Sequence, residues 1–400
     1  MSQSDIDPYL QASYLQKLRD TGTIFLTDLD GTHATRMSSV RELEDRAAVR
    51  RFLDKRKFVA GAVTARTPAL TMTRASFLAS RERGLAEEEP HCGFDERGRR
   101  VYVPPEELPF FAHSQDWDVI ACLGSGVFPR NGHGYLIDRE FDNLLNYDHE
   151  KGKKSEKYYE PVPWRQAVLA FLVKVWPQAR EHFSPLEFRE NYLAGITDVM
   201  PLPYRIQLHF EGAEGLARMR ELREILRRKM YDNDPIALRM AVVDESKPSA
   251  EVERCKYTIY LLPWAARKEK MINHLVSRSA AAAQAPVKRL FYAGDTPTDL
   301  RAGLYAGGGV PLHFLLATGS PLAPYLLERR SSFGEESLSF LWESDRRERP
   351  RLIETKRRGV YTCKVPTRPW TNLVVVGDEV YRGMTPPGSV RAFLEEFAND

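Results

Sequence analysis

A short apolar run that ends in two closely spaced carboxylates constrains the fold of this chain more than any other feature. Residues 23–27 read Thr-Ile-Phe-Leu-Thr, and Asp28-Leu29-Asp30-Gly31-Thr32 follows without a break. An apolar, β-branched run of this length predicts a strand buried within a parallel sheet. Open parallel sheets bind ligands at the carboxyl ends of their strands, and this is where the run places Asp28 and Asp30. Gly31 permits a tight turn and a close approach of backbone amides to an anion.

Similar strand and helix patterns occur on either side of the middle of the chain. One strand ends at Thr64, and another runs directly into Gly294-Asp295. Strand, helix and strand in this order predict βαβ units and therefore an α/β fold class. The predicted helices of these units cover residues 39–55 and 299–305, and the predicted strands cover residues 58–63, 287–293 and 312–317.

The middle of the chain has a different order of predicted strands and helices. A length of 400 residues also favours two domains. We predict a Rossmann-like parallel-sheet core built from residues 1–70 and 263–400, the second part with a C-terminal extension. Residues 71–262 are predicted to form an inserted α+β cap domain with an extended linker. Outside the βαβ units, helices are predicted over residues 8–20, 164–179 and 214–230, and strands over residues 118–122, 205–210, 237–243, 257–262, 360–365 and 373–376.

Two more carboxylates follow a predicted strand in the second part of the core. Asp295 and Asp299 have a GDxxxD spacing, which places one at the strand tip and the other about one helical turn further on. Either pair by itself could serve to cap a helix. Together with Asp28 and Asp30 they form a set of four carboxylates that would repel one another unless a hard cation lay among them.

Two residues with the chemistry to hold a phosphoryl group complete the pattern. Thr64 offers a hydroxyl at a strand end, although threonine is common at such positions. Lys268 begins a predicted helix after a strand and could neutralise negative charge. The neighbouring Arg267 and Lys270 leave open which basic residue has that role, and a surface lysine is the plain alternative.

These motifs, in this order, resemble those of the haloacid dehalogenase superfamily of phosphotransferases. The chain looks like the members with a type C2 (C2B) cap inserted between the second and third motifs, a group similar to sucrose-phosphate, mannosyl-3-phosphoglycerate and trehalose-phosphate phosphatases and to phosphomannomutase. The resemblance extends into the cap, where residues 118–127 look like the strand and glycine turn of the family and residues 203–207 like a cap strand that contacts substrate.

The resemblance implies a role for each motif residue. Asp28 would be the nucleophile and Asp30 the general acid and then base. Thr64 and Lys268 would bind the phosphoryl group. The resemblance further implies a Mg²⁺ ion held by Asp28, the backbone carbonyl of Asp30 and Asp295, with Asp299 supporting the ligands of the metal. These roles suit a reaction whose transition state needs positioning and charge neutralisation more than covalent chemistry.

Within the cap, Arg205 and Gln207 are the candidate substrate contacts. They alternate along the predicted strand and so would project from one face, with Tyr204 and Ile206 on the other. The alternative is that they form the solvent face of a half-buried sheet.

Composition excludes several other classes of protein. A net charge of +3 from 58 basic and 55 acidic residues is too balanced for a nucleic-acid footprint. No apolar run approaches the ~20 residues of a membrane span. The four cysteines are scattered, as suits a reducing compartment. The polar, acidic N-terminus lacks the features of a secretory signal, so we expect a cytoplasmic protein.

The prediction is therefore a phosphatase for a small phosphorylated metabolite, most plausibly a sugar phosphate. A phosphohexomutase of the phosphomannomutase type would use the same Asp28 and Asp30 but would need to rebind its phosphorylated intermediate. A non-catalytic binding protein on the same fold is the second alternative. The leaving alcohol and the oligomeric state are not predicted, because no readable motif sets either.

Overall fold

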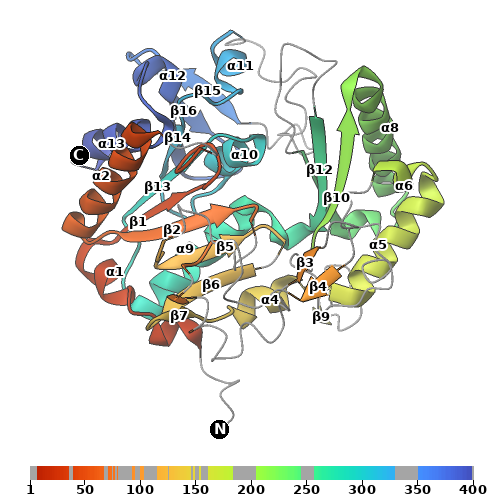
Figure 1. Cartoon of the computed structure of the whole chain (residues 1–400), viewed down its shortest axis with the longest axis horizontal. Helices are drawn as coiled ribbons and strands as arrows, with labels where there is room; N and C mark the ends of the chain where they lie inside the picture. The colour runs from red at the N-terminus through yellow and green to blue at the C-terminus, as the bar shows by residue number, and fades with distance from the viewer. Residues whose placement is uncertain are drawn as a thin grey trace. The chain divides into compact units, whose positions relative to one another are not determined.

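The structure is a computed structural model of the whole chain (Figure 1). The residues that it describes are 7–35, 39–66, 71–73, 75–76, 79, 92–94, 100–102, 115–124, 126–145, 147–148, 153–154, 161–182, 204–244, 256–328 and 350–398.

The chain divides into two compact units, which are described separately. We call Ser13–Thr64 together with Lys268–Asp400 the core unit, and Met1–Ala12 together with Ala65–Arg267 the inserted unit. Both divisions fall near the predicted boundaries after residues 70 and 262, although the first twelve residues group with the inserted unit. The assignment of a core domain and a cap domain stays a prediction.

A parallel sheet with an antiparallel edge forms the centre of the core unit. Its strands are β1 (Thr23–Thr27), β2 (Val59–Thr64), β13 (Arg289–Gly294), β14 (Leu312–Leu316), β15 (Arg351–Glu354), β16 (Val360–Lys364) and β17 (Thr371–Val376). They are ordered β15-β16-β17-β14-β13-β1-β2, with parallel pairing from β17 to β2 and antiparallel pairing of β15, β16 and β17. Both β1 and β2 are buried along their whole length. The predicted α/β class with a Rossmann-like parallel sheet is confirmed.

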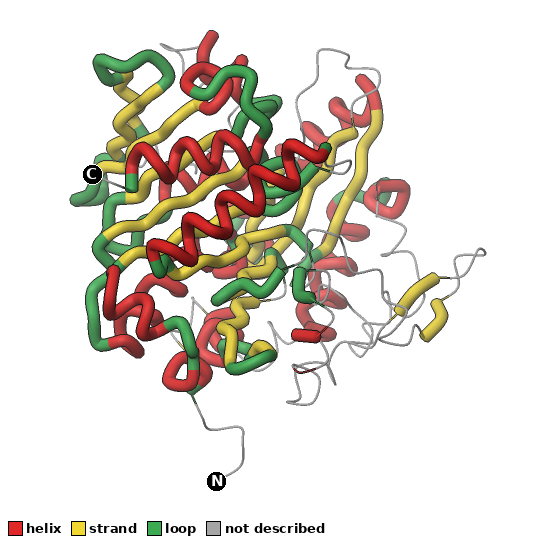
Figure 2. Tube along the Cα trace, turned by 60° about the vertical axis from the view of Figure 1, so that its left-hand side comes forward, coloured by secondary structure: helices red, strands yellow, loops and turns green. Residues whose placement is uncertain are grey.

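The helices of the core unit lie over the sheet, and Figure 2 shows two long helices crossing the strands on the side that faces the viewer. They are α1 (Leu15–Thr21), α2 (Val40–Arg56), α9 (Lys268–Ala283), α10 (Pro297–Tyr305), α11 (Ala323–Glu328), α12 (Gly377–Val380) and α13 (Pro386–Phe397).

Side-chain contacts show that these helices cover both faces of the sheet. Phe393 of α13 packs edge-to-face on Phe291 of β13, with ring centroids 5.9 Å apart. Gly303 of α10 lies so close to the Phe314 ring that a Cβ there would come within 2.3 Å of it. Phe291 pairs in register with His313, so Phe291 and Phe314 point to opposite faces. Therefore α13 and α10 lie on opposite sides.

This arrangement places a topological switch between β1 and β13. Helix α2 packs against α13, so the connection from β1 to β2 runs over one face, whereas α10 carries the connection from β13 to β14 over the other. Open α/β sheets bind ligands in the crevice where neighbouring connections diverge in this way. The switch lies at the strands that end at Asp28 and Asp295.

A three-stranded antiparallel sheet, ordered β10-β12-β11, is the largest sheet wholly within the described part of the inserted unit. Helix α8 packs on β10 and β12 through a buried stripe of Met219, Leu222 and Leu226. The strands β5, β6 and β7 pair antiparallel in sequence order. The strands of the unit are β3 (Cys92–Phe94), β4 (Arg100–Tyr102), β5 (Val119–Cys122), β6 (Gly126–Asn131), β7 (Gly134–Tyr135), β8 (Tyr147–Asp148), β9 (Lys153–Lys154), β10 (Ile206–Glu211), β11 (Met240–Asp244) and β12 (Lys256–Pro263), and its helices are η2 (Pro8–Gln11), α4 (Arg139–Leu145), α5 (Pro161–Val175), α6 (Ala179–His182), α8 (Gly212–Tyr231), η5 (Ala237–Arg239) and η7 (Trp264–Ala266).

Three predicted elements differ in the structure. The helix predicted over residues 164–179 ends at Val175, and Ala179 begins the separate helix α6. The predicted single helix over residues 8–20 is wrong, because Ala12 is extended and separates η2 from α1. The predicted strand over residues 237–243 begins only at Met240. The Asp234 carboxylate accepts hydrogen bonds from the amides of Ile236 and Ala237 and fixes a turn there instead. Ser125, Pro203 and much of the two stretches 68–117 and 331–349 lie outside the described residues.

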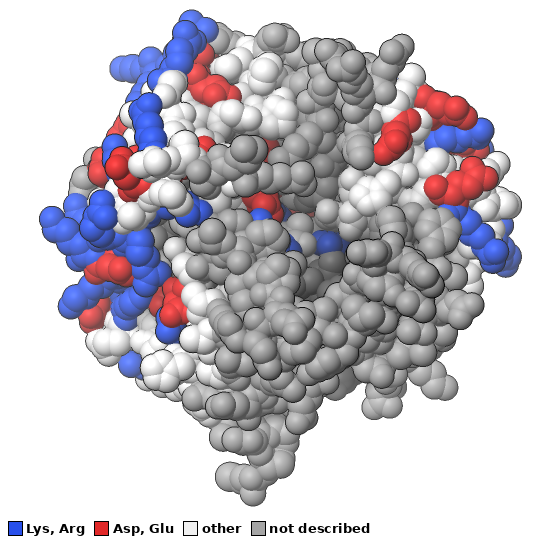
Figure 3. Space-filling view, viewed as in Figure 1, with Lys and Arg blue, Asp and Glu red and all other residues white. Residues whose placement is uncertain are grey.

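Charged side chains are unevenly distributed over the described surface. Figure 3 shows Lys and Arg gathered on the side of α2, with acidic residues among them. Helix α8 has a more even mixture, in which Arg227 and Arg228 both pair with Glu224. Such alternation is typical of solvated helix faces. Among the described residues, no helix is both long and apolar enough to cross a membrane.

Candidate active site

The parallel register of the sheet delivers the predicted site residues to one edge of the core unit. Thr27, the last residue of β1, pairs with Ala293 of β13 and with Ala62 of β2. The amide of Asp28 still donates to the Ala293 carbonyl over 2.8 Å, so Asp28 stands one residue beyond the strand in a fixed position. Thr64 is the buried last residue of β2 and ends at the same edge.

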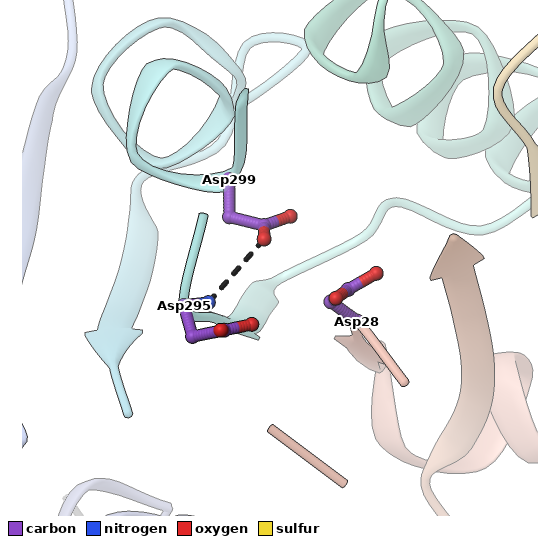
Figure 4. A group of neighbouring side chains, drawn as sticks. All are labelled: Asp28, Asp295 and Asp299. Carbon is purple, nitrogen blue, oxygen red and sulfur yellow. Dashed lines mark hydrogen bonds between the residues drawn. The ribbon is translucent and has the colours of Figure 1, made fainter. Parts of the chain in front are cut away.

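Three carboxylates from separate elements meet at this edge. Asp28 follows β1, Asp295 follows β13 and Asp299 lies in the first turn of α10 (Figure 4). One oxygen from each lies within 4.8 Å of the others, and all three side chains are buried. Such a concentration of buried negative charge is stable only if cations or several hydrogen-bond donors balance it.

Lys268 is the cation that the core unit itself supplies to this cluster. It is the first residue of α9, and only 1% of its side chain is exposed. Its ammonium donates to Asp28 Oδ1 over 3.1 Å and to Asp299 Oδ1 over 2.7 Å. The guanidinium of Arg267, in contrast, lies 3.6 Å from the centre of the Trp264 ring. Lys268 therefore bonds directly to two of the three carboxylates.

The single positive charge of Lys268 does not neutralise three carboxylates, and the excess of negative charge affects the pKa of Asp28. Burial raises the pKa of Asp28 well above its usual value. Lys268 opposes the shift, while Asp299, Asp295 and Asp30 reinforce it. A buried carboxyl group with a strongly perturbed pKa and a specific charge partner is typical of functional sites.

Hydrogen-bond donors surround Asp299 on both of its carboxylate oxygens. Oδ1 accepts from Lys268 and from the phenol of Tyr292. Oδ2 accepts from the Thr296 hydroxyl at 2.6 Å, the Thr296 amide at 3.0 Å and the Asp295 amide at 3.3 Å. Thr296 and Asp299 also form the capping box of α10. A carboxylate has about four lone-pair sites, so Asp299 is fully occupied by these donors and suits a supporting role.

Asp295 is held in place from two sides. Its Oδ1 accepts from the Thr32 hydroxyl at 3.2 Å, and its backbone carbonyl accepts from the Ser320 hydroxyl at 2.7 Å. A Cβ on Gly31 would lie only 2.3 Å from Asp295 Oδ2, and Gly31 has a φ of +83°. Only glycine therefore fits the turn that brings the Asp28-to-Thr32 segment against Asp295.

Asp30 lies apart from the carboxylate cluster. It is two residues beyond Asp28, its side chain is exposed, and its backbone forms an isolated bridge with Ala34. The structure thus separates a buried carboxylate at position 28 from a solvent-accessible one at position 30.

The predicted substrate contacts of the inserted unit have unequal surroundings. Gln207, on β10, is half-buried, and its side-chain nitrogen lies 3.1 Å from His209 Nε2. Arg205 precedes the strand and is 7% exposed. Its guanidinium donates to the Ala65 carbonyl over 2.6 Å and lies 4.4 Å from the centre of the Tyr260 ring. Arg205 is therefore bound within its own unit.

Sequence reasoning did not identify Tyr292, Thr32 or Ser320. A tyrosine within the apolar stretch 290–293 was the one sequence feature that could have identified Tyr292, because a buried phenol usually requires a hydrogen-bond partner. Thr32 and Ser320 gave no such signal, because each bonds to Asp295 over a long separation in sequence. Thr32 is 263 residues from Asp295, and Ser320 is 25 residues from it.

Comparisons with known proteins found only distant similarities to solved structures. No family model and no curated protein matches this sequence. A haloacid dehalogenase-like hydrolase, yhjK, from Bacillus subtilis is similar with a TM-score of 0.36 and 14% identity, over 75% of this chain and 83% of that chain. A trehalose-6-phosphate phosphatase from Aspergillus fumigatus is similar with a TM-score of 0.35 and 15% identity, over 77% and 88% of the two chains. Likenesses of this strength assign neither a family nor an activity, so both must be argued from the site.

Proposed function

We propose that this chain is a Mg²⁺-dependent phosphatase that hydrolyses a small phosphomonoester through an aspartyl-phosphate on Asp28. The arrangement that supports this most directly is the buried Asp28 carboxylate, bonded to the buried Lys268 and next to Asp295 at the switch point of a parallel sheet. The order of the sequence motifs, which resembles that of haloacid dehalogenase phosphotransferases, supports the same reaction.

Asp28 is suited to attack phosphorus because it is fixed at a strand end and faces a cation. In the proposed first step, a carboxylate oxygen of Asp28 forms a bond to phosphorus and the bond to the leaving alcohol breaks. Lys268 neutralises charge that would otherwise repel the incoming phosphate dianion. Thr64, at the adjacent strand end, would donate its hydroxyl to a phosphoryl oxygen. Water then attacks the same phosphorus and releases Asp28 and inorganic phosphate.

Asp30 is proposed to handle the protons of both steps. Its exposed side chain is open to exchange with solvent, unlike the buried Asp28. In the first step it would protonate the leaving alkoxide, and in the second it would take a proton from the attacking water. The two carboxylates thus differ in environment in the way that their different roles require.

The donor set fits a hard divalent cation. Asp28 and Asp295 offer buried carboxylate oxygens, and the single positive charge of Lys268 does not neutralise the three carboxylates of the cluster. We propose that Asp28, Asp295 and the backbone carbonyl of Asp30 hold Mg²⁺, with Asp299 outside the ligand set. All-oxygen ligands favour Mg²⁺ over softer metals. Mg²⁺ would neutralise negative charge on the phosphoryl oxygens.

A sugar phosphate is the proposed substrate class. The half-buried Gln207, His209 and Thr258 share one face of the three-stranded sheet in the inserted unit, and amide, imidazole and hydroxyl groups suit hydroxyl-rich ligands. The proposal assigns discrimination between leaving alcohols to this unit, since the core residues address the phosphoryl group alone.

A phosphate-release screen over a panel of phosphorylated metabolites, with and without Mg²⁺, tests the proposed function. Mg²⁺-dependent release from one group of phosphomonoesters, absent in the Asp28→Asn variant, is the expected result. Release of no phosphate from any member contradicts it. A hexose 1-phosphate with an activating bisphosphate should be included, because formation of an isomer in place of free phosphate indicates a mutase.

A further inference from the structure

We propose that Tyr292 is a positioning residue for this reaction, acting through Asp299 to keep the ammonium of Lys268 directed at Asp28. This inference rests on the proposed function and adds a residue to it. It concerns a side chain that belongs to none of the sequence motifs and that bonds to Asp299.

Tyr292 is built into the sheet directly below the carboxylate cluster. It lies on β13, two residues before Gly294, and is completely buried. Its ring packs against Phe314 on the neighbouring strand, with centroids 5.6 Å apart. Its hydroxyl donates to Asp299 Oδ1. The rigid ring and the strand therefore fix the position from which this donor reaches Asp299.

Asp299 Oδ1 is shared between two donors, and this sharing affects Lys268. The same oxygen accepts from the Tyr292 hydroxyl and from the Lys268 ammonium, while Oδ2 is occupied by Thr296 and Asp295. With Tyr292 in place, Lys268 need not satisfy Oδ1 alone. The Lys268 ammonium can then keep its bond to Asp28 at 3.1 Å and, in the proposed reaction, stay beside the phosphoryl group.

Removal of the phenol oxygen would leave Lys268 as the sole donor to Oδ1. The buried carboxylate would then hold the ammonium more tightly, because an unsatisfied buried acceptor is costly. Lys268 would be drawn toward Asp299 and away from Asp28. We therefore expect weaker binding of tetrahedral and trigonal oxyanions, with little change at Asp28 and Asp295 as metal ligands.

The Tyr292→Phe variant isolates this hydroxyl, since phenylalanine keeps the ring that packs on Phe314. Steady-state kinetics on the best substrate of the screen should be combined with calorimetric titrations of Mg²⁺ and of orthovanadate. We expect kcat/KM and vanadate affinity each to fall at least tenfold, about the effect of losing one hydrogen bond to a charged group. Mg²⁺ affinity should remain within about twofold of the wild type, or ~0.4 kcal/mol, because Tyr292 contacts Asp299, which lies outside the proposed ligand set.

Tyr14→Phe is the matched control. Tyr14 is also completely buried in the core unit, and its hydroxyl bonds to Ser279 at 3.2 Å. This variant loses a comparable buried hydroxyl away from the carboxylate cluster, so it should lose stability but retain kcat/KM and vanadate affinity. A merely structural role for Tyr292 would make the two variants behave alike.

The outcomes separate this inference from the proposed function. If the wild type neither releases phosphate nor binds vanadate, the proposed function fails and the inference fails with it. If the wild type does both and Tyr292→Phe stays within about twofold on both measures, only the inference is overturned. An equal loss of Mg²⁺ affinity in Tyr292→Phe also overturns it, because that result indicates general damage to the site.

Discussion

The carboxyl edge of the core sheet and the three-stranded sheet of the inserted unit use polar residues in opposite ways. At the core edge, Asp299 and Lys268 are buried and take part in several hydrogen bonds each. On the β10-β12-β11 sheet, one face packs on α8, and the other carries half-buried side chains such as Gln207 and His209, which lie 3.1 Å apart. A fully buried network fixes the geometry for one reaction, whereas half-buried side chains can be exchanged for others at little cost.

The largest effect is expected when the proposed nucleophile of the core network is replaced. Asp28→Asn keeps the shape of the side chain but removes its nucleophilic oxygen, so turnover should fall by at least about a hundredfold. Steady-state phosphate release measures the loss, and circular dichroism checks the fold. Asp54→Asn, at an exposed position on α2, is the control for a change of charge. Retention of more than about a hundredth of the wild-type rate removes Asp28 from the proposed role.

Removal of the metal tests whether the carboxylate cluster of the core unit needs a bound cation. Excess chelator should silence phosphate release and Mg²⁺ should restore it. Because Mg²⁺ would bind only the folded site, thermal unfolding should also shift upward, corresponding to about 2.7 kcal/mol at a concentration a hundred times Kd. Asp295→Asn should lose this shift. Undiminished activity in excess chelator contradicts a metal-dependent mechanism.

The raised pKa of Asp28 gives the metal-free protein a definite pH dependence. Its pKa in the folded state lies above the ordinary value of 3.8, so folding favours the protonated form. The associated stability is present below pH ~4 and is lost as pH rises through the raised pKa. We therefore expect the unfolding temperature of the wild type minus that of Asp28→Asn, both measured with chelator present, to decrease from pH 4 to neutral pH. A difference that stays constant or grows over this range disagrees with a raised pKa.

The smallest effects are expected in the inserted unit, where variants of Arg205 and Gln207 separate an effect on stability from an effect on substrate preference. Arg205→Ala removes the bond to Ala65 and the contact with Tyr260, and should lower the free energy of unfolding by about 1–3 kcal/mol. Gln207→Ala should leave stability nearly unchanged and reduce kcat/KM for the preferred sugar phosphate by up to about tenfold, or ~1.4 kcal/mol. Hydrolysis of a small aryl phosphate should be unaffected in Gln207→Ala; an equal loss on both substrates assigns Gln207 to the common machinery.

The sequence by itself determined the parts of this protein that depend on short-range order. The apolar run before Asp28, the turn at Gly31 and the GDxxxD spacing predicted which carboxylates follow strand ends, and left helix capping open as an alternative role for them. These features follow from strand burial, glycine conformation and helix capping, and each is decided within a few neighbouring residues. The break at Ala12 was missed, because helical spacing alone does not reveal where two units divide.

Only the tertiary structure decided how these residues act on one another. Lys268 reaches Asp28 across 240 residues of sequence, and nothing local distinguished it from Arg267 and Lys270. The partnership of Tyr292 with Asp299 depends on how β13 and α10 pack. Arg205, a predicted substrate contact, bonds to Ala65, 140 residues away. Motifs specify chemical groups at strand ends, whereas long-range packing determines which donor satisfies which buried acceptor.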